Sequence, residues 1–360
     1  MRYFKWSVTI AMAAVLAACG GGGSDVPAKP RFTSQVSFGD SLSDVGSYKV
    51  GLVAAIGGGQ FTINIPNTAT NWTELTAQQF GLSAPCAAET GLDNGSGAPP
   101  GTPTGTVIPV TDYATCTGYA QGGARVTNPI GIGNKALGGG GFALTVPVAT
   151  QISNHLAAHG GSFTGHEIVF VMAGANDVFY QLGLVGASAA TPTEAVTAMA
   201  TEAGNLVNDI NTLILANGAK YVVVVNIPDI VSTPFGATLT PGPSGSQVLV
   251  DTMVTTFNSA LQSGLSGTAN VLLVDAYNAS KDEVAHPSKY NLTDVTHTAC
   301  DLASPYNPLA SSLGCNANSL STGVSVSDHY LFADTVHPTP YGHALFATYV
   351  LQAMTNKGWY

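Results

Sequence analysis

Charged side chains are scarce in this sequence, and basic side chains are the scarcest. Asp, Glu, Lys and Arg make up 9% of the 360 residues, whereas an average soluble domain contains about 25%. The chain has 11 Lys and Arg against 21 Asp and Glu, which gives a formal net charge of −10. Such an acidic chain offers no electrostatic footprint for nucleic acid or for an anionic lipid surface. We therefore expect no nucleic-acid partner.

Long hydrophobic runs are missing as well, so we expect no membrane-spanning helix. The apolar run at residues 8–16 is too short to span a bilayer, but it follows Arg2 and Lys5 and precedes the tetrapeptide that ends in Cys19. This order resembles a bacterial lipoprotein signal, and the alternative is an ordinary signal peptide with an incidental cysteine. We predict that residues 1–18 are removed, that Cys19 carries the lipid, and that residues 19–32 form a tether.

The lipoprotein resemblance also implies a location. Removal of Arg2 and Lys5 with the signal peptide changes the formal charge from −10 to −12. The residue after Cys19 is Gly20, whereas an Asp at that position retains many lipoproteins at the inner membrane. We therefore expect an exported lipoprotein of the outer membrane, on its periplasmic or its external face, and we expect a monomer.

Cysteine is rare, and its spacing matches no zinc-ligand pattern. Besides Cys19, the chain has Cys86, Cys116, Cys300 and Cys315. Four cysteines in an exported chain favour two disulfides, for which three pairings are possible. We favour Cys86–Cys116 and Cys300–Cys315, because each of these bonds would close a polar loop that burial cannot hold.

Signatures of cofactor chemistry are absent from the sequence. No glycine-rich segment continues into the Lys-Ser/Thr pair of a phosphate-binding loop. His155 and His159 lie four residues apart on a predicted helix, with His166 nearby, but they do not form a His-Glu-x-x-His motif. We interpret them as a solvated helix face, and we predict no metal and no cofactor.

Unbroken apolar segments alternate with helical patterns along the chain, which indicates an α/β fold with a parallel sheet covered on both faces. We predict one domain over residues 33–360, with loop insertions near 83–118 and 286–328. Within the first insertion, residues 83–112 show no apolar periodicity. The expected strands span about residues 33–38, 113–119, 167–172, 220–225 and 271–274, and the expected helices span about 50–56, 71–81, 146–159, 193–217, 248–265 and 341–354.

Four segments follow strands or lie in loops, and together their residues could carry out acyl transfer. Ser41 follows the first strand in Phe-Gly-Asp-Ser, and a serine hydroxyl needs a base to become a nucleophile. His337 would be that base, and Asp334, three residues earlier, would orient its ring. The N–H groups of Ser41 and Gly123 and the side-chain amide of Asn176 would hold the oxyanion.

These blocks, in this order, resemble the GDSL or SGNH serine esterases and lipases. The resemblance implies a flavodoxin-like three-layer αβα sandwich, and its catalytic positions fall on Ser41, Gly123, Asn176 and His337, with Asp334 as the triad acid. Many members have Asn where this chain has Gly118, which leaves Gly122 as the alternative to Gly123. The chain has no Gly-x-Ser-x-Gly nucleophile elbow, which argues against the α/β-hydrolase fold.

The sequence therefore predicts a serine-dependent carboxylic ester hydrolase. Acyl lipids or phospholipids are the favoured substrates, and short-chain or aryl esters and acyl transfer to an alcohol are the alternatives. A rival of another class is a non-catalytic surface lipoprotein on a hydrolase scaffold. Of the other polar residues, we expect Asp40 and Asp44 to bind backbone amides around the Ser41 turn and Asp177 to brace its loop.

Overall fold

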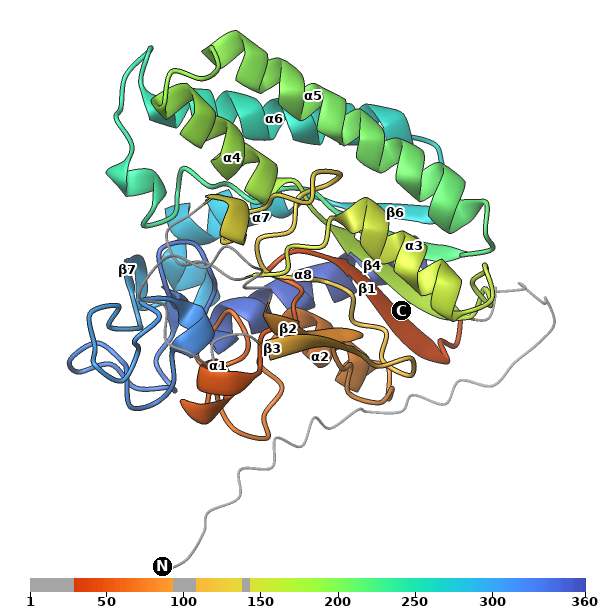
Figure 1. Cartoon of the computed structure of the whole chain (residues 1–360), viewed down its shortest axis with the longest axis horizontal. Helices are drawn as coiled ribbons and strands as arrows, with labels where there is room; N and C mark the ends of the chain where they lie inside the picture. The colour runs from red at the N-terminus through yellow and green to blue at the C-terminus, as the bar shows by residue number, and fades with distance from the viewer. Residues whose placement is uncertain (1–28, 93–107, 138–142) are drawn as a thin grey trace, which may run out of the picture.

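The computed structural model describes residues 29–92, 108–137 and 143–360, and Figure 1 shows a central sheet with helices above and below it. The predicted signal peptide, Cys19 and most of the tether lie outside the described residues.

Four parallel strands form the central sheet, in the order β1-β4-β5-β6. These strands are β1 (Ser34–Gly39), β4 (Glu167–Met172), β5 (Tyr221–Val225) and β6 (Val271–Val274). Every neighbouring pair in this sheet is parallel. All six residues of β4 are buried, because a central strand of a parallel sheet is covered on both faces. The predicted α/β class with a parallel sheet is confirmed.

Successive side chains of β4 enter two different hydrophobic cores, as the alternation of a strand requires. Val169 and Val171 pack into a core with α3 (Val148–Ala158), α5 (Pro192–Asp209) and α6 (Ser246–Leu265). Phe170 packs into a second core with α2 (Trp72–Gln79) and α8 (Pro340–Lys357). Trp72 of α2 is fully buried there, with its ring centroid 4.8 Å from that of Phe170. The sheet is therefore the middle of three layers.

The six predicted helices begin and end close to the predicted positions, whereas the helices at Ala175–Gly186 and Ala276–Ala285 were not predicted. Asn71 and Glu74, which are three residues apart, form the capping box of α2. The α-helices are α1 (Gly51–Ala55), α2 (Trp72–Gln79), α3 (Val148–Ala158), α4 (Ala175–Gly186), α5 (Pro192–Asp209), α6 (Ser246–Leu265), α7 (Ala276–Ala285) and α8 (Pro340–Lys357). The shorter turns are η2 (Lys135–Leu137), the π-helical η3 (Ile210–Leu215), η4 (Gly236–Thr238), η5 (Pro287–Tyr290) and η6 (Ser312–Gly314).

The prediction was wrong in the first insertion. Residues 83–112 contain β2 (Glu89–Leu92) and β3 (Ile108–Asp112), which pair as antiparallel strands. β3 is mostly exposed, so backbone pairing rather than burial defines it and no apolar period marks it in the sequence. Residues 113–119 form no strand, and Gly118 makes only isolated bridges with Ser37 and Ala87.

The second insertion also contributes to a small sheet. Within residues 286–328, β7 (Asp294–Thr298) pairs in parallel with β8 (Tyr330–Phe332). Disulfides join Cys86 to Cys116 and Cys300 to Cys315, with Cα–Cα distances of 5.1 and 6.0 Å. These are the two local pairings that the sequence favoured.

His155 was assigned to a solvated helix face, and that interpretation was wrong. Its side chain is buried beside the rings of Phe38, Tyr119 and Phe163, and no described residue bonds either ring nitrogen. His159 is exposed, as expected. Among the described residues, no group of three or more His, Cys, Asp or Glu could hold a metal ion, and no helix is both long and apolar enough to cross a membrane.

We predict that His155 makes the fold less stable in acid. Burial lowers the pKa of His155 to about 4, so between about pH 6.5 and 4 the unfolded chain binds a proton that the folded chain does not. The free energy of unfolding should then fall as the pH falls, by up to ~1.4 kcal/mol per pH unit. His155→Phe should flatten this part of a urea-unfolding profile, and His159→Phe should not. A profile unchanged by His155→Phe would contradict the prediction.

Candidate active site

Ser41 lies just beyond the end of β1, at the carboxyl edge of the sheet. Gly39 ends the strand against β4, where a Cβ atom would lie 2.4 Å from the carbonyl oxygen of Met172. Gln151 of α3 holds both backbone groups of Gly39, because its Oε1 accepts the Gly39 N–H at 2.8 Å and its Nε2 donates to the Gly39 carbonyl at 2.8 Å. The start of the Ser41 turn is thereby fixed from two sides.

The turn around Ser41 is held by the carboxylate before it. Asp40 accepts the N–H of Leu42 on Oδ1 at 3.1 Å, and its carbonyl accepts the N–H of Ser43 at 3.1 Å. Burial raises the pKa of Asp40 to about 6, although the Leu42 N–H opposes this shift. Asp40 binds a backbone amide of this turn, as the sequence predicted.

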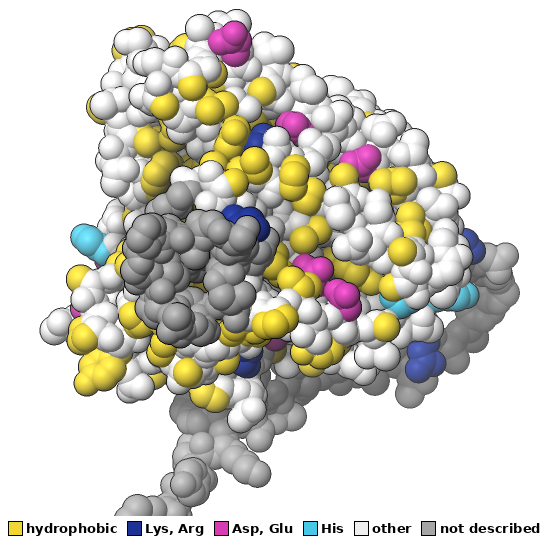
Figure 2. Space-filling view, in the orientation of Figure 1, with side chains coloured by type: hydrophobic (Ala, Val, Ile, Leu, Met, Phe, Trp, Pro, Cys, Tyr) yellow, Lys and Arg dark blue, Asp and Glu magenta, His cyan; other side chains and the backbone are white. Residues whose placement is uncertain are grey.

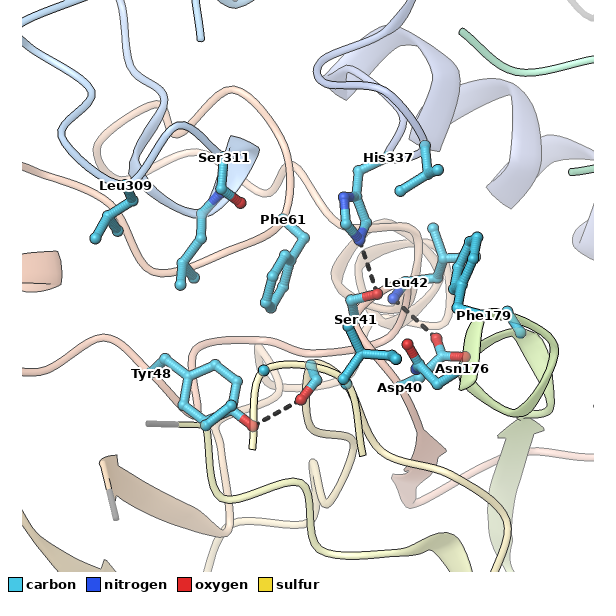
Figure 3. A pocket seen from close by; sticks show the side chains of 18 of the residues that line it. Asp40, Ser41, Leu42, Tyr48, Phe61, Asn176, Phe179, Leu309, Ser311 and His337 are labelled. Carbon is cyan, nitrogen blue, oxygen red and sulfur yellow. Dashed lines mark hydrogen bonds between the residues drawn. The ribbon is translucent and has the colours of Figure 1, made fainter. Parts of the chain in front are cut away.

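Ser41 and His337 are 296 positions apart in the sequence, and their side chains are in hydrogen-bond contact in the structure. The His337 Nε2 lies 2.8 Å from the Ser41 Oγ, and the His337 Nδ1 lies 2.9 Å from both carboxylate oxygens of Asp334. Figure 3 shows the His337 ring pointing at the Ser41 hydroxyl from one side, while Asn176 and Asp40 lie on the other side. The ring of Phe61 packs against the imidazole, with centroids 4.9 Å apart.

Asp334 is buried and surrounded by donors. Its Oδ1 accepts the N–H groups of Val336 and His337 at 3.0 and 2.8 Å, and its Oδ2 accepts the N–H of Ser312 at 2.9 Å. Burial alone would raise the pKa of Asp334, but the charge on His337 and these hydrogen bonds hold it well below its usual range. The carboxylate is therefore ionised and has a fixed orientation toward the imidazole.

The segment that contains Gly122 and Gly123 runs beside Ser41, and Asp44 determines which N–H group is free. The Oδ2 of Asp44 accepts the N–H of Gly122 at 2.9 Å, and its Oδ1 accepts the N–H groups of Gly46 and Ser47, each at 2.8 Å. No described residue accepts the N–H of Gly123. Of the two glycines that the sequence left open, Gly123 is thus the one with an available donor.

A second pair of residues holds the other end of this segment. Asn176, in the first turn of α4, donates from Nδ2 to the carbonyl of Ala124 at 2.9 Å. Asp177 accepts the Nε–H of Arg125 at 2.7 Å and the N–H of Val126 at 3.0 Å. Asp177 is fully buried and braces its loop, as predicted.

Gly118 occupies the position at which many members of the resembled family have Asn, and the structure accounts for this difference. A Cβ atom at position 118 would lie 2.8 Å from the carbonyl oxygen of Cys86 and 2.8 Å from Cγ2 of Val45. The backbone at Gly118 also exchanges hydrogen bonds with the first disulfide loop. The close approach of that loop therefore requires glycine.

Comparison with known proteins assigns the chain to a family. Residues 36–350 match the GDSL-like Lipase/Acylhydrolase family. The chain belongs to this family. One similar solved structure is an alpha/beta hydrolase enzyme from the metagenome of Lake Arreo, Spain, with 14% identity and a TM-score of 0.43 over 91% of this chain and 96% of that one. No curated protein matches the chain.

Membership of the GDSL-like family makes the protein a serine hydrolase of ester bonds, and the structure places its candidate residues around a single cavity. The cavity has a volume of about 860 Å³ and includes Ser41, Gly123, Asn176 and His337 in its wall. Most of the other lining residues are apolar, and they include Leu52, Val53, Phe61, Ile108, Phe179, Leu309 and Leu313.

Three residues of this GDSL-like site were not predicted from the sequence. Gln151, Phe61 and Ser312 contact Gly39, His337 and Asp334, respectively. Ser312 acts through its backbone N–H, for which residue type carries no signal. Gln151 was detectable in principle, as a buried polar position on the apolar face of a predicted helix.

We predict that Gly123→Ala lowers ester hydrolysis about 100-fold or more, the usual effect of displacing one oxyanion donor. The φ angle of Gly123 is 80°, and a Cβ atom would lie 1.9 Å from the carbonyl oxygen of Ile132, so the peptide must move. Gly57 has the same φ of 80° with no atom within 4 Å. Gly57→Ala therefore carries the same backbone strain without the clash, and it should retain kcat. Equal losses of kcat in both variants would contradict this prediction.

Proposed function

We propose that the protein hydrolyses carboxylic esters through a triad of Ser41, His337 and Asp334. The observation that carries the proposal is the 2.8 Å contact between the Ser41 Oγ and the His337 Nε2, with Asp334 on the opposite side of the same ring. A hydroxyl, an imidazole and a carboxylate in this order are what acyl transfer to serine requires.

In the first half of the reaction, His337 removes the hydroxyl proton as the Ser41 Oγ attacks the ester carbonyl. The tetrahedral intermediate collapses when His337 gives this proton to the leaving alcohol, and an acyl-serine remains. In the second half, His337 takes a proton from water as the water oxygen attacks the acyl-serine. The second tetrahedral intermediate collapses when His337 gives this proton to the Ser41 Oγ, and the carboxylic acid leaves. Asp334 holds the imidazole in one tautomer and stabilises the imidazolium in both halves.

Three donors converge on the place where the oxyanion would form. They are the N–H groups of Ser41 and Gly123, which no described residue accepts, and the second proton of the Asn176 amide, whose first proton bonds Ala124. Because Asp44 holds the Gly122 peptide and the Ala124 carbonyl holds the Asn176 amide, these donors need no reorganisation during the reaction. Each is worth roughly 3 kcal/mol of barrier lowering.

The apolar wall of the cavity supports esters with a hydrocarbon acyl group as substrates. Side chains such as Leu52, Ile108 and Phe179 would be desolvated by such a group, at roughly 25 cal/mol of stabilisation per Å² of apolar surface. We therefore propose acyl-lipid esters as the substrate class.

Ser41→Ala should lower kcat/KM roughly 10⁴-fold or more, because it removes the nucleophile. A fluorophosphonate ester should label one peptide, the one that contains Ser41, and the label should disappear in Ser41→Ala. Ser43 is a buried serine of the same turn, so Ser43→Ala is the matched control and should still be labelled. Labelling of another residue, or hydrolysis that survives Ser41→Ala, would disprove the triad.

We also propose that the protein is exported and anchored to the outer membrane through a lipid on Cys19. The support is the sequence pattern alone, a short apolar run after Arg2 and Lys5 that ends in this cysteine. A labelled fatty acid fed to expressing cells should be incorporated into the wild type and not into Cys19→Ala. Equal incorporation into both proteins would refute the anchor.

A further inference from the structure

The cavity beside Ser41 carries negative charge in its wall. Asp40 and Asp229 both line it, and both are buried, with 2% and 4% exposure. Asp229 accepts the N–H of Val231 on Oδ1 at 3.0 Å and the hydroxyl of Ser232 on Oδ2. The hydrogen bonds that Asp40 and Asp229 accept come from neutral donors, and neither carboxyl group forms an ion pair with a described Lys or Arg. Burial raises the pKa of Asp40 to about 6, so Asp40 carries its charge above that pH.

The hydroxyl groups of the wall are already used within the protein. The Tyr48 hydroxyl donates to the Gly122 carbonyl at 2.7 Å and accepts the Thr145 N–H at 3.2 Å. The Thr233 hydroxyl donates to the Ile230 carbonyl at 2.7 Å. The Ser311 hydroxyl also lines the wall, and its Oγ accepts the Leu313 N–H at 3.2 Å. The part of the wall away from the catalytic groups therefore presents hydrocarbon, the Ser311 hydroxyl and two carboxyl groups to a substrate.

Lys and Arg side chains do not line this cavity in the part of the chain that the structure describes, and the basic group in its wall is His337. Eleven Lys and Arg, less Arg2 and Lys5 of the N-terminal segment, leave nine, and residues 93–107 and 138–142 contain none of them by sequence. Arg125, which follows the Gly123 segment, is buried in its ion pair with Asp177. Figure 2 likewise shows a face with many hydrophobic and few charged side chains.

An anionic head group would enter this cavity at a cost. It would lose hydration against an apolar wall, and it would face Asp40 and Asp229 at a low effective dielectric, where repulsion is stronger than in water. A neutral head group meets neither penalty. The carboxylate product of hydrolysis would be repelled by the same two groups, which favours its release.

We propose that the site is selective for neutral acyl esters, of the monoacylglycerol type, and discriminates against esters whose alcohol part carries a phosphate. The reaction adds water across the acyl C–O bond and gives a carboxylic acid and a neutral alcohol. This inference rests on the proposed function and narrows its substrate class.

The test compares two substrates that differ in one group, 1-decanoylglycerol and 1-decanoylglycerol 3-phosphate. Both are used as monomers at the same pH and ionic strength. We expect kcat/KM to be at least about tenfold higher for the neutral ester, and we expect added salt to narrow the ratio. Equal values, or a preference for the phosphate, would overturn the proposal.

Two sets of variants test whether the preference for the neutral ester arises from charge. Asp229→Asn keeps the shape and an acceptor for the Val231 N–H, and it should reduce the preference about threefold or more. Leu52 lines the cavity and is 52% exposed, so Leu52→Lys should fold and should raise kcat/KM for the phosphate ester relative to the matched control Leu52→Gln. If the ratio of the two kcat/KM values changes in neither Asp229→Asn nor Leu52→Lys, the electrostatic origin of the selectivity is overturned.

The same measurements distinguish a failure of this inference from a failure of the proposed function. If the wild type hydrolyses both esters equally and Ser41→Ala hydrolyses neither, the selectivity is wrong and the triad stands. If hydrolysis of the neutral ester survives in Ser41→Ala, the proposed function itself fails.

Discussion

The contact between Ser41 and His337 depends on one property of the sheet, which is that its parallel strands end at a common edge. Ser41 follows β1 and Asn176 follows β4 at that edge, and the loop between β8 and α8 brings His337 to the same place. Ligand sites in open α/β sheets form at the carboxyl ends of the strands for this reason. A serine and a histidine so far apart in sequence meet because the end of β1 positions Ser41 and the loop between β8 and α8 positions His337.

Buried carboxylates fix the loops that extend from this edge. Asp44 ties the Ser41 turn to the Gly122 peptide, Asp177 ties α4 to the segment after Gly123, and Asp334 ties His337 to Ser312. Each carboxylate accepts at least two backbone N–H groups or a charged donor, which compensates for its burial. Although the chain has few charged residues, three of its carboxylates are buried at this edge of the sheet, where they fix the backbone of the site loops.

The sequence was sufficient where burial or a motif left a strong pattern. The strand at 220–225 was evident because both of its faces are covered, and Ser41, Asp334 and His337 were found through residue types that chemistry requires. It was insufficient where the deciding contact is made by the backbone. The choice of Gly123 over Gly122 follows from a hydrogen bond to Asp44, and the pairing of β2 with β3 leaves no apolar period. His155 was misread because its burial comes from Phe38 and Phe163. Both residues lie outside the helix, and the periodicity of a helix in the sequence does not reveal such contacts.

The two insertions, which look like decoration in the sequence, each support one half of the site. The loop closed by Cys86–Cys116 bonds Gly118 through the Cys86 carbonyl at 3.0 Å, four residues before the Gly122 peptide. The loop closed by Cys300–Cys315 supplies the Ser312 N–H that holds Asp334. Cys300 and Cys315 lie in a small buried cluster with Ala299 and Ala333, and each cross-link limits the freedom of the loop that it closes. The positions of the Gly123 segment and of Asp334 therefore depend on the two disulfides. Disulfides persist in an oxidising compartment. The proposed export would therefore place the protein where the cross-links that hold the site can persist.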